Sequence, residues 1–388
     1  MSARELLTRG VAKLIPDALA KEKIASGKKL RIYWGIDPTG SRLHLGHAVP
    51  LRKMQQFADA GHQVIMLIGS FTAMIGDPTD KEGMRTVLTK EQVEENFKTY
   101  KEQASKILDF SKIEIRYNNE WLDTLTLRDA IGLASHFTVQ QMLERDMFEK
   151  RISEGKPIGY HEFFYPLMVG YDSVVLDVDC EIGGTDQEFN MLAGRTLQKA
   201  FGKRDKFVLT MKLLEGTDGR KMSKTYDNCV YVDDEPKDMY GKLMRVEDRL
   251  ITAYMECCTD IPMEDIAAAE KAMKKGENPK QCKMHLAKEI VALYHDTNAA
   301  TKAEEEFTRL FSEKGLPDDV PQAKAKNGDS LIDLLIREGL IPSKSEARRL
   351  IEQKGITLND ISVTALDAPA EEGIARVGKR KFLNIEIH

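Results

Sequence analysis

The sequence predicts an α/β protein with a parallel β-sheet covered by helices, followed by an all-α domain and a small α+β domain. Strand-like and helix-like segments alternate over residues 1–228, which is typical of a parallel sheet. Residues 229–322 contain amphipathic helical segments without a strand pattern. Residues 323–388 then restart with two short helices and end in an alternating strand, in which Leu383, Ile385 and Ile387 would face one side.

The composition is that of an ordinary globular protein. The 388 residues are 42% hydrophobic, so the chain can bury at least one large core. The net charge of −5 argues against a uniformly basic surface, so any nucleic acid must bind at local patches. The five cysteines are an odd number without CxxC spacing, which favours reduced thiols in the cytoplasm over disulfides or a structural metal site. No apolar run approaches the roughly 18 residues of a membrane helix and no signal peptide is recognisable, so no membrane association is expected.

The first segment, residues 3–27, is predicted to be helical. Leu6, Leu7, Val11 and Leu14 recur at helical spacing before Pro16 interrupts the pattern. We expect this segment to pack against the rest of the domain.

Residues 31–51 predict a buried strand, a turn and a helix. The strand residues 32–34 are β-branched or aromatic, and Asp37, Pro38 and Gly40 then supply turn chemistry. A second apolar run, residues 64–70, is too short for a helix and is predicted to be another buried strand. Together they make a βαβ unit, in which ligands bind at the carboxyl ends of the strands.

Two histidines lie in the first turn of the predicted helix. His44 and His47 are three residues apart and therefore share one face, while Gly46 leaves room for a flat ligand. A helix N-terminus favours anions, so phosphate binding is the first hypothesis. The alternative, that both histidines only cap or solvate the helix end, is about equally supported by this motif alone.

The segment of about residues 86–160 is predicted to be a helical insertion between two half-sheets. Residues 88–110 have a helical pattern that Thr89 and Gln92 begin as a capping box. Residues 127–152 are also helical and are rich in Phe and Met. Packing within the chain and a subunit interface are both open interpretations of these apolar residues.

The α/β pattern resumes in residues 161–194 and 207–228. Asp172 lies in an apolar segment, so its carboxylate needs a partner from the protein or from a substrate. The sequence GGTDQ, residues 183–187, places two glycines before an acid and an amide at a predicted strand end. The loop GRKMSKT, residues 219–225, carries Lys221 and Lys224 and is compatible with clamping a polyphosphate, although such a charge run alone is usually solvated surface.

The pairing of His44-Leu45-Gly46-His47 with Lys221-Met222-Ser223-Lys224-Thr225 resembles the signature pair of class I aminoacyl-tRNA synthetases. The sequences YWGIDPT, IGDPTDK and GGTDQ, and the spacing of Tyr165 and Asp172, resemble the tyrosyl-tRNA synthetase branch over most of residues 1–228. This resemblance implies a Rossmann-like catalytic domain, activation of L-tyrosine by ATP with Mg²⁺ carried on the ATP, and transfer of the tyrosyl group to tRNA(Tyr). It also implies a homodimer.

Site residues follow from the resemblance position by position. Tyr33 and Asp172 would meet the phenol hydroxyl of tyrosine, while Asp77 and Tyr165 would hold its ammonium group and Gln187 would lie near its head. The positions that match ATP-binding residues are Gly35, Asp37, Gly46, Asp186 and Met222. The positions that match residues acting on the phosphates or the transition state are Thr39, His44, His47, Lys81, Arg85, Lys221, Lys224 and Thr225.

Two positions depart from the family pattern. Val169 stands where the family usually has a glutamine that helps to bind the α-amino group, and Thr225 replaces the commoner serine. Val169 leaves open a paralogue that only binds RNA or a ligand, or one with changed amino-acid specificity. A nucleotidyltransferase of the same superfold is a further alternative, but it gives no reason for the Lys221 loop.

The remaining domains are assigned by the same resemblance. Residues 229–322 would be the anticodon-side domain, with a linker predicted at residues 317–329 from its Pro, Lys and Gly content. Residues 323–388 resemble the S4-type RNA-binding module. Its basic residues available to phosphates are Lys344, Arg348, Arg349 and Lys354.

Overall fold

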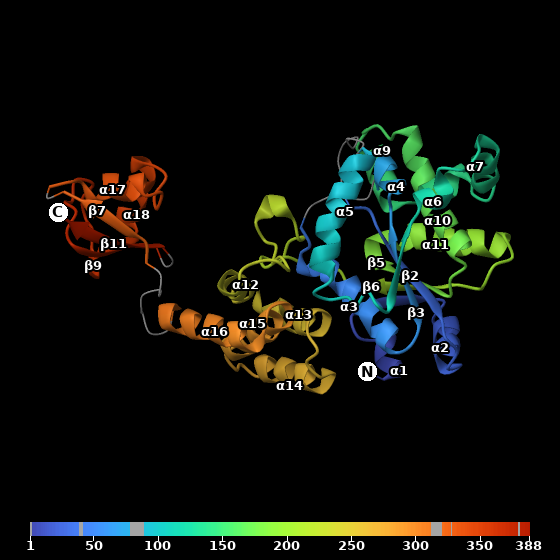
Figure 1. The fold of residues 1–388 in the computed structure, drawn as a ribbon, viewed down its shortest axis with the longest axis horizontal. Helices are drawn as coiled ribbons and strands as arrows, with labels where there is room; N and C mark the ends of the chain where they lie inside the picture. The colour runs from blue at the N-terminus through green and yellow to red at the C-terminus, as the bar shows by residue number, and fades with distance from the viewer. Residues whose placement is uncertain (1, 39–41, 78–88, 312–319, 327, 379–380) are drawn as a thin grey trace. The chain divides into compact units, whose positions relative to one another are not determined.

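The computed structural model describes residues 2–38, 42–77, 89–311, 320–326, 328–378 and 381–388. The chain divides into two compact units, Met1–Thr297 and Asn298–His388 (Figure 1). This division coincides with neither predicted boundary, so the three domains 1–228, 229–322 and 323–388 stay a prediction.

Unit 1 contains, in its described part, a six-stranded sheet in the order β1-β6-β5-β2-β3-β4 (Figure 1). Strands β2 to β6 run parallel, and β1 pairs antiparallel with β6 at one edge. The central strands are continuous apolar runs because helices bury them on both faces. The strands are β1 (Val11–Ile15), β2 (Arg31–Ile36), β3 (Gln63–Ile68), β4 (Ile113–Tyr117), β5 (Cys180–Gly184) and β6 (Phe207–Met211).

Helices cover the two faces of this sheet. Helix α3 packs against β2, β3 and β5 on one face. Helices α10 and α11 pack against each other on the other face of the sheet (Figure 1). Their apolar residues share a core with Tyr33, Ile65 and Leu67 of the sheet. The α-helices of this part are α1 (Ala3–Leu6), α2 (Asp17–Ala25), α3 (Leu45–Asp59), α4 (Thr72–Ile75), α5 (Lys90–Ala104), α6 (Asn119–Leu122), α7 (Leu127–Ala134), α8 (Val139–Leu143), α9 (Asp146–Ser153), α10 (Phe164–Leu176) and α11 (Glu188–Ala200).

The predicted parallel sheet and its βαβ unit are confirmed, but the N-terminal helix is wrong in part. Residues 11–15 form β1, whereas residues 3–6 and 17–25 are helical. Gly10 adopts a φ of +68° in the turn between α1 and β1, and β1 then gains backbone hydrogen bonds along β6. The spacing of Leu6, Val11 and Leu14 did not distinguish a helix from this short strand.

The described part of the predicted insertion 86–160 contains five α-helices, as expected, and one strand that was not predicted. Helix α5 begins at the predicted capping box, in which Thr89 and Gln92 exchange hydrogen bonds. Strand β4 then extends the sheet beside β3. The segment 127–152 forms three short helices because Thr138 caps a new helix and Arg145 precedes another.

The predicted helical character of residues 229–322 is confirmed for residues 236–311, whereas Gln322 begins a strand. The α-helices there are α12 (Pro236–Leu243), α13 (Ile251–Cys258), α14 (Met263–Lys274), α15 (Lys280–Tyr294) and α16 (Thr297–Phe311). The 3₁₀ helices among the described residues are η2 (Tyr160–Phe163), η3 (Thr185–Gln187), η4 (Lys224–Tyr226) and η5 (Asp248–Leu250).

Unit 2 contains, among its described residues, a five-stranded sheet in the order β7-β11-β10-β8-β9 with two further helices packed on an apolar core. Strand β7 lies inside the predicted linker 317–329, which is therefore wrong for these residues. The buried Ala323 and Ala325 alternate with exposed residues, and β7 pairs parallel with β11. The elements are β7 (Gln322–Ala325), α17 (Leu331–Arg337), α18 (Lys344–Glu352), β8 (Ile356–Leu358), β9 (Ile361–Ser362), β10 (Gly373–Val377) and β11 (Lys381–Ile387).

Among the described residues, no helix is both long enough and apolar enough to cross a membrane.

Candidate active site

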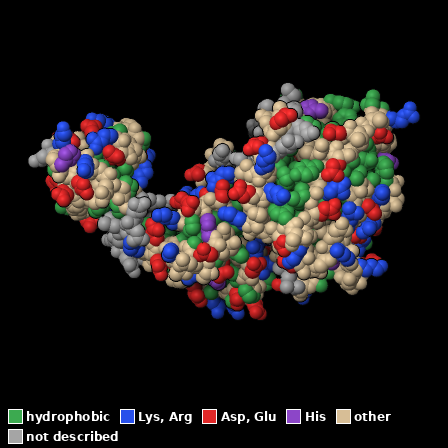
Figure 2. Space-filling view, in the orientation of Figure 1, with side chains coloured by type: hydrophobic (Ala, Val, Ile, Leu, Met, Phe, Trp, Pro, Cys, Tyr) green, Lys and Arg blue, Asp and Glu red, His purple; other side chains and the backbone are tan. Residues whose placement is uncertain are grey.

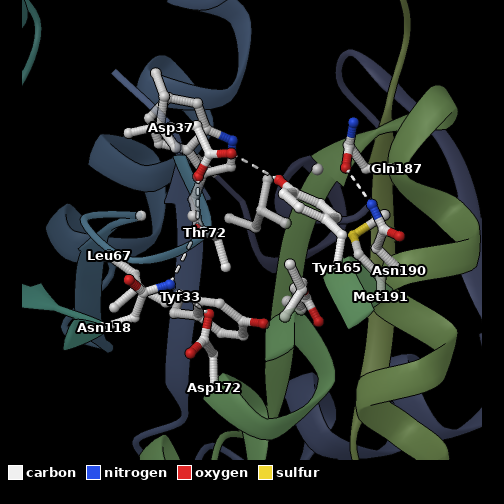
Figure 3. Close-up of a pocket in the computed structure, with 18 residues that line it drawn as sticks. Tyr33, Asp37, Leu67, Thr72, Asn118, Tyr165, Asp172, Gln187, Asn190 and Met191 are labelled. Atoms are coloured by element: carbon white, nitrogen blue, oxygen red, sulfur yellow. Dashed lines mark hydrogen bonds between the residues drawn. The ribbon is translucent and has the colours of Figure 1, made fainter. Parts of the chain in front are cut away.

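A pocket opens at the carboxyl ends of β2 and β5, where α10 and α11 close its side (Figure 3). Tyr33 of β2 and Asp172 of α10 lie at its floor, and both are almost completely buried. Asp172 accepts hydrogen bonds from Trp121 Nε1 at 2.7 Å and from Asn118 Nδ2 at 3.1 Å. Burial raises the pKa of Asp172 well above its ordinary value. The floor therefore presents the carboxyl group of Asp172 and the hydroxyl group of Tyr33.

The wall of this pocket is fixed by hydrogen bonds to Asp37. The two carboxylate oxygens of Asp37 accept hydrogen bonds from Thr72 Oγ1 at 2.7 Å and from Tyr165 Oη at 2.9 Å (Figure 3). Burial, followed by the neighbouring Asp37, raises the pKa of Tyr165, so this phenol stays protonated and donates. Asp37 thus joins the end of β2 to α10.

The mouth of the pocket carries a second polar chain. Asp77 accepts from Arg145 Nη2 at 2.7 Å and from Gln187 Nε2 at 2.7 Å. Asn190 Nδ2 in turn donates to Gln187 Oε1 at 2.8 Å (Figure 3). Val169 also lines the pocket, so this position contributes apolar surface where the family pattern has an amide.

A larger cavity continues from the pocket and shares residues 34–37, Tyr165 and Gln187 with it. It brings together residues from Trp34 to Arg249 of the sequence. The predicted residues that line it are Gly35, Asp37, His44, Gly46, His47, Asp77, Tyr165, Asp186, Gln187, Lys221 and Met222. The two histidines and Lys221 therefore do face one space, as the resemblance implied.

The histidine pair is held at the beginning of α3. The imidazole rings of His44 and His47 stack with their centroids 3.8 Å apart. The backbone N–H of His44 donates to His47 Nδ1 at 3.3 Å, so the proton of the neutral His47 ring is on Nε2. His44 Nδ1 is buried and has no hydrogen-bond partner among the described residues.

Both histidines are neutral in the free protein. Burial and, to a smaller extent, the charge of Lys221 lower the pKa of His44 to about 4. Burial and the adjacent His44 lower the pKa of His47 to about 3. Each neutral ring can still donate one hydrogen bond to an anion.

Gly46 is required by close packing. A Cβ at this position would lie 3.0 Å from the His44 ring and 3.6 Å from Met222 Sδ. A side chain here would therefore displace the histidine or fill the space next to the signature loop.

That loop, residues 215–228, is organised by the buried Asn228. Its side chain accepts from the backbone N–H of Ser223 at 2.8 Å and donates to the Lys221 carbonyl at 3.1 Å and to Asp218 at 2.8 Å. Thr225 is exposed and does not line the cavity, whereas Lys221 and Met222 do line it. The side chain of Lys224, and the predicted residues Thr39, Lys81 and Arg85, lie outside the described residues.

Several residues of the site were not predicted. Thr72, Asn118, Trp121 and Arg145 support Asp37, Asp172 or Asp77, and they come from segments that the sequence patterns did not link to the pocket. Asn118 and Trp121 directly follow β4, so recognising that strand would have pointed to this end of the sheet. Arg145 carried no comparable signal.

The predicted RNA-binding residues lie on and just after α18. Lys344, Arg348, Arg349 and Lys354 are all exposed. Lys344 pairs with Asp333 and Arg349 with Glu346, whereas Lys354 has a φ of +55°. Separately, the described residues contain no group of three or more His, Cys, Asp or Glu side chains that could hold a metal ion.

Comparisons with known protein families place nearly the whole chain. A family model described as "tRNA synthetases class I (W and Y)" matches residues 25–312, and one described as "Tyrosine--tRNA ligase SYY-like C-terminal domain" matches residues 312–383.

Individual relatives agree over the full length. The chain is 48% identical to a tyrosine–tRNA ligase of Thermotoga maritima, with 98% of this chain and 96% of that protein covered. It is 47% identical to the tyrosine–tRNA ligase of Carboxydothermus hydrogenoformans over 98% of this chain and 97% of that protein.

Solved structures share the fold. Tyrosyl-tRNA synthetase from Archaeoglobus fulgidus, complexed with L-tyrosine, superposes with a TM-score of 0.64 at 22% identity and covers 78% of this chain and 100% of that chain. A truncated mitochondrial tyrosyl-tRNA synthetase from Coccidioides posadasii gives a TM-score of 0.63 at 25% identity, covering 78% and 90% of the two chains.

Proposed function

This chain belongs to the tyrosine–tRNA ligase family of class I synthetases, and we propose that its two joined cavities activate L-tyrosine with ATP for transfer to tRNA(Tyr). The observation that carries the proposal is the continuity of the pocket above Tyr33 and Asp172 with the cavity that contains His44, His47 and Lys221. With L-tyrosine in the pocket and ATP in the larger cavity, the reacting groups of the two substrates would lie where the cavities meet.

The pocket would hold tyrosine by both of its ends. The phenol hydroxyl would reach Tyr33 and Asp172 at the floor. Because a buried polar group without a hydrogen-bond partner costs free energy, the floor would favour a substrate that can hydrogen-bond there. The ammonium group would lie near Asp77 and Tyr165 at the mouth, with Gln187 beside the head of the amino acid. Val169 adds no polar contact, so Asp77 and Tyr165 would bind the ammonium group without the glutamine that the family usually has at this position.

The larger cavity would hold ATP. Gly35, Asp37, Gly46, Asp186 and Met222 would surround the adenosine, and the histidines and Lys221 would meet the phosphates. The predicted residues Thr39, Lys81, Arg85, Lys224 and Thr225 are proposed to act on the same phosphates. Mg²⁺ would arrive with ATP and add positive charge on the phosphate oxygens.

In the first step, a tyrosine carboxylate oxygen forms a bond to the α-phosphorus of ATP. The bond from that phosphorus to the bridging oxygen breaks, and pyrophosphate leaves with the electron pair. Negative charge spreads over the phosphoryl oxygens in the transition state, so donors held in place stabilise it without acting as nucleophiles. The His47 Nε2 proton and the Lys221 ammonium group are such donors.

In the second step, a ribose hydroxyl of the tRNA attacks the tyrosyl carbonyl carbon. The bond to the AMP oxygen breaks, and the hydroxyl proton is released as the ester forms. The exposed basic residues of α18 and Lys354 would contact tRNA phosphates elsewhere on the molecule.

We further infer a homodimer in the cytoplasm. Apolar side chains gather at the end of unit 1 that bears α7 (Figure 2), and the α7 residues Leu127 and Ile131 are 76% and 62% exposed. A cluster of this kind is typical of a subunit interface. The five cysteines are free, as expected for a reducing compartment.

The test is exchange of labelled pyrophosphate into ATP with each of the twenty amino acids. We expect exchange with tyrosine alone, and charging of tRNA(Tyr) by the same protein. Exchange with a different amino acid would support changed specificity at Val169, and its absence with all of them would support a non-catalytic paralogue.

A further inference from the structure

A group of buried polar side chains adjoins the floor of the amino-acid pocket, and one of them, Glu181, also lines the pocket. Ser173, Glu181 and Lys206 are each at most 3% exposed, and the reaction described above makes no use of them. Buried charged groups persist only where they are paired and hydrogen-bonded, so their arrangement needs an explanation.

These three residues meet the hydroxyl group of Tyr33. Tyr33 Oη and Ser173 Oγ are 2.9 Å apart. Lys206 Nζ donates to Ser173 Oγ at 2.8 Å and forms an ion pair with Glu181. Ser173 Oγ donates to Glu181 Oε2 at 3.3 Å. The four side chains therefore form one closed cluster, which we call the floor cluster.

The fold brings the floor cluster together from four elements. Tyr33 of β2 and Glu181 of β5 are register partners, while Lys206 immediately precedes β6 and Ser173 follows Asp172 on α10. Helix α11 leaves the space open with a glycine, since a Cβ at Gly194 would lie 2.4 Å from Ser173 Oγ and 2.5 Å from Lys206 Nζ.

Counting hydrogens fixes the direction of the bonds. A lysine ammonium group only donates and an ionised carboxylate only accepts. Ser173 has one proton, which Glu181 takes, so its oxygen accepts from both Lys206 and Tyr33. The Tyr33 proton is then taken up by Ser173 Oγ, and the Tyr33 oxygen keeps a lone pair for the substrate.

We propose that Ser173, Glu181 and Lys206 are positioning residues for tyrosine selection, which hold the Tyr33 hydroxyl oxygen in place against the phenol of the substrate. The inference rests on the proposed tyrosine activation and names three residues that set its specificity. Without the cluster, Tyr33 would lose the partner of its proton, and its hydroxyl would turn between alternative positions.

The electrostatics of the floor agree with this role. Burial, followed by Glu181 and Asp172, raises the pKa of Tyr33 well above its ordinary value, so Tyr33 remains a neutral phenol. Burial lowers the pKa of Lys206, while Glu181 acts in the opposite direction and keeps the ammonium charge paired. The cluster is therefore a neutral support under the pocket.

The variant that removes the fewest contacts is Ser173→Ala, because it leaves the Lys206–Glu181 pair intact. Its matched control is Thr210→Val on β6. Thr210 is also fully buried in this sheet, but its hydroxyl has no hydrogen-bond partner among the described residues. The measurements are kcat and KM for tyrosine, for phenylalanine and for ATP in pyrophosphate exchange, with thermal melting of each full-length variant.

We expect Ser173→Ala to lower kcat/KM for tyrosine about tenfold, the loss that accompanies one buried hydrogen bond, mainly through a higher KM. The KM for ATP and kcat/KM for phenylalanine should stay unchanged, so discrimination between the two amino acids also falls about tenfold. Thr210→Val should change none of these ratios.

If Ser173→Ala and Thr210→Val discriminate equally well between tyrosine and phenylalanine, the proposal is overturned, whatever the melting temperatures of the two variants. If Ser173→Ala does not fold, the near-isosteric Ser173→Cys is subjected to the same comparison with the same two outcomes. A wild-type protein without tyrosine-dependent exchange would instead contradict the proposed function itself.

Discussion

Asp172 shows how much of a residue's role depends on its neighbours. Its carboxylate is buried in the pocket floor and accepts from Trp121 and Asn118, which together hold it in one orientation. Neither donor adjoins it in sequence. In the proposed complex, the hydroxyl group of the substrate would therefore meet a carboxyl group that is held in one orientation.

Replacing Asp172 with alanine should abolish selection for tyrosine while ATP still binds. The variant leaves two donors unpaired at the floor, and we expect discrimination against phenylalanine to fall by at least about tenfold. Pyrophosphate exchange with both amino acids measures this ratio, and the KM for ATP serves as an internal reference.

The control for that change is Asp179→Ala. Asp179 is also a buried carboxylate, but it precedes β5 at the opposite end of the strands, where it pairs with Lys23 and Arg204. The loss of Asp179 should destabilise the fold without altering discrimination between tyrosine and phenylalanine. Should both variants discriminate equally well, Asp172 would have no part in recognising the phenol.

Site residues were predictable where they lie in contiguous motifs. His44, Gly46, His47, Lys221 and Met222 share one cavity, as their two motifs indicated. By contrast, the floor cluster depends on strand register and on the packing of α10, which one sequence cannot supply. Its members also have no spacing that separates them from an ordinary surface Ser, Glu or Lys.

At the scale of elements, the start of α3 makes folding stability depend on pH. His44 and His47 stay neutral in the folded state down to pH values of about 4 and 3, whereas unfolded histidines take up protons near pH 6.5. The unfolded state thus binds more protons below pH 6.5, and the free energy of unfolding falls as the pH decreases towards 4. Each histidine contributes a slope of up to about 1.4 kcal/mol per pH unit.

Urea unfolding of the free protein between pH 7 and 4 measures this slope, and the double variant His44→Asn/His47→Asn supplies the comparison. The variant should lose the histidine contribution but keep that of the carboxylates. Parallel curves for the two proteins would mean that these histidines do not remain neutral on folding.

Helix α18 is the element to test for RNA binding. Reversing two exposed charges in Arg348→Glu/Arg349→Glu should weaken binding of tRNA(Tyr) and reduce the salt dependence of its affinity by about two phosphate contacts. Tyrosine-dependent pyrophosphate exchange, which needs no tRNA, should be unchanged. Filter binding at several salt concentrations gives both quantities.

A second double reversal, Lys28→Glu/Lys29→Glu, controls for net charge. Both lysines are exposed next to the amino end of β2, away from the site at its carboxyl end. An equal loss of tRNA affinity in the two variants would assign the effect to net charge and not to α18.

The elements that the sequence predicted poorly are short strands at sheet edges or ends. β1, β4 and β7 have four or five residues each, too few for a periodic pattern to distinguish them from helix or linker. Their strand state comes from backbone pairing with a neighbour. The longer elements with a strong period, such as α5 and β3, were predicted correctly because local pattern and tertiary packing agree.

At the scale of the whole molecule, the exposed apolar residues on α7 predict the state of assembly. Leu127→Glu/Ile131→Glu introduces two charges where the side chains are 76% and 62% exposed, so the monomer should fold normally and fail to pair. Light scattering should give the mass of a dimer for the wild type and of a monomer for the variant.

Ile361→Glu is the matched control, because Ile361 on β9 is also 74% exposed but belongs to unit 2. It should leave the dimer intact. A wild-type mass equal to one chain, at micromolar concentration, would contradict the interface.

The position of Lys206 has a consequence for chemical labelling of the folded enzyme. Amine reagents attack only an uncharged amino group that solvent can reach, and the Lys206 side chain is completely buried. Under native conditions it should react only when the whole of unit 1 opens, long after the exposed lysines. The rate at which mass spectrometry detects a label on Lys206 would therefore report the frequency of global unfolding, and bound tyrosine should slow it.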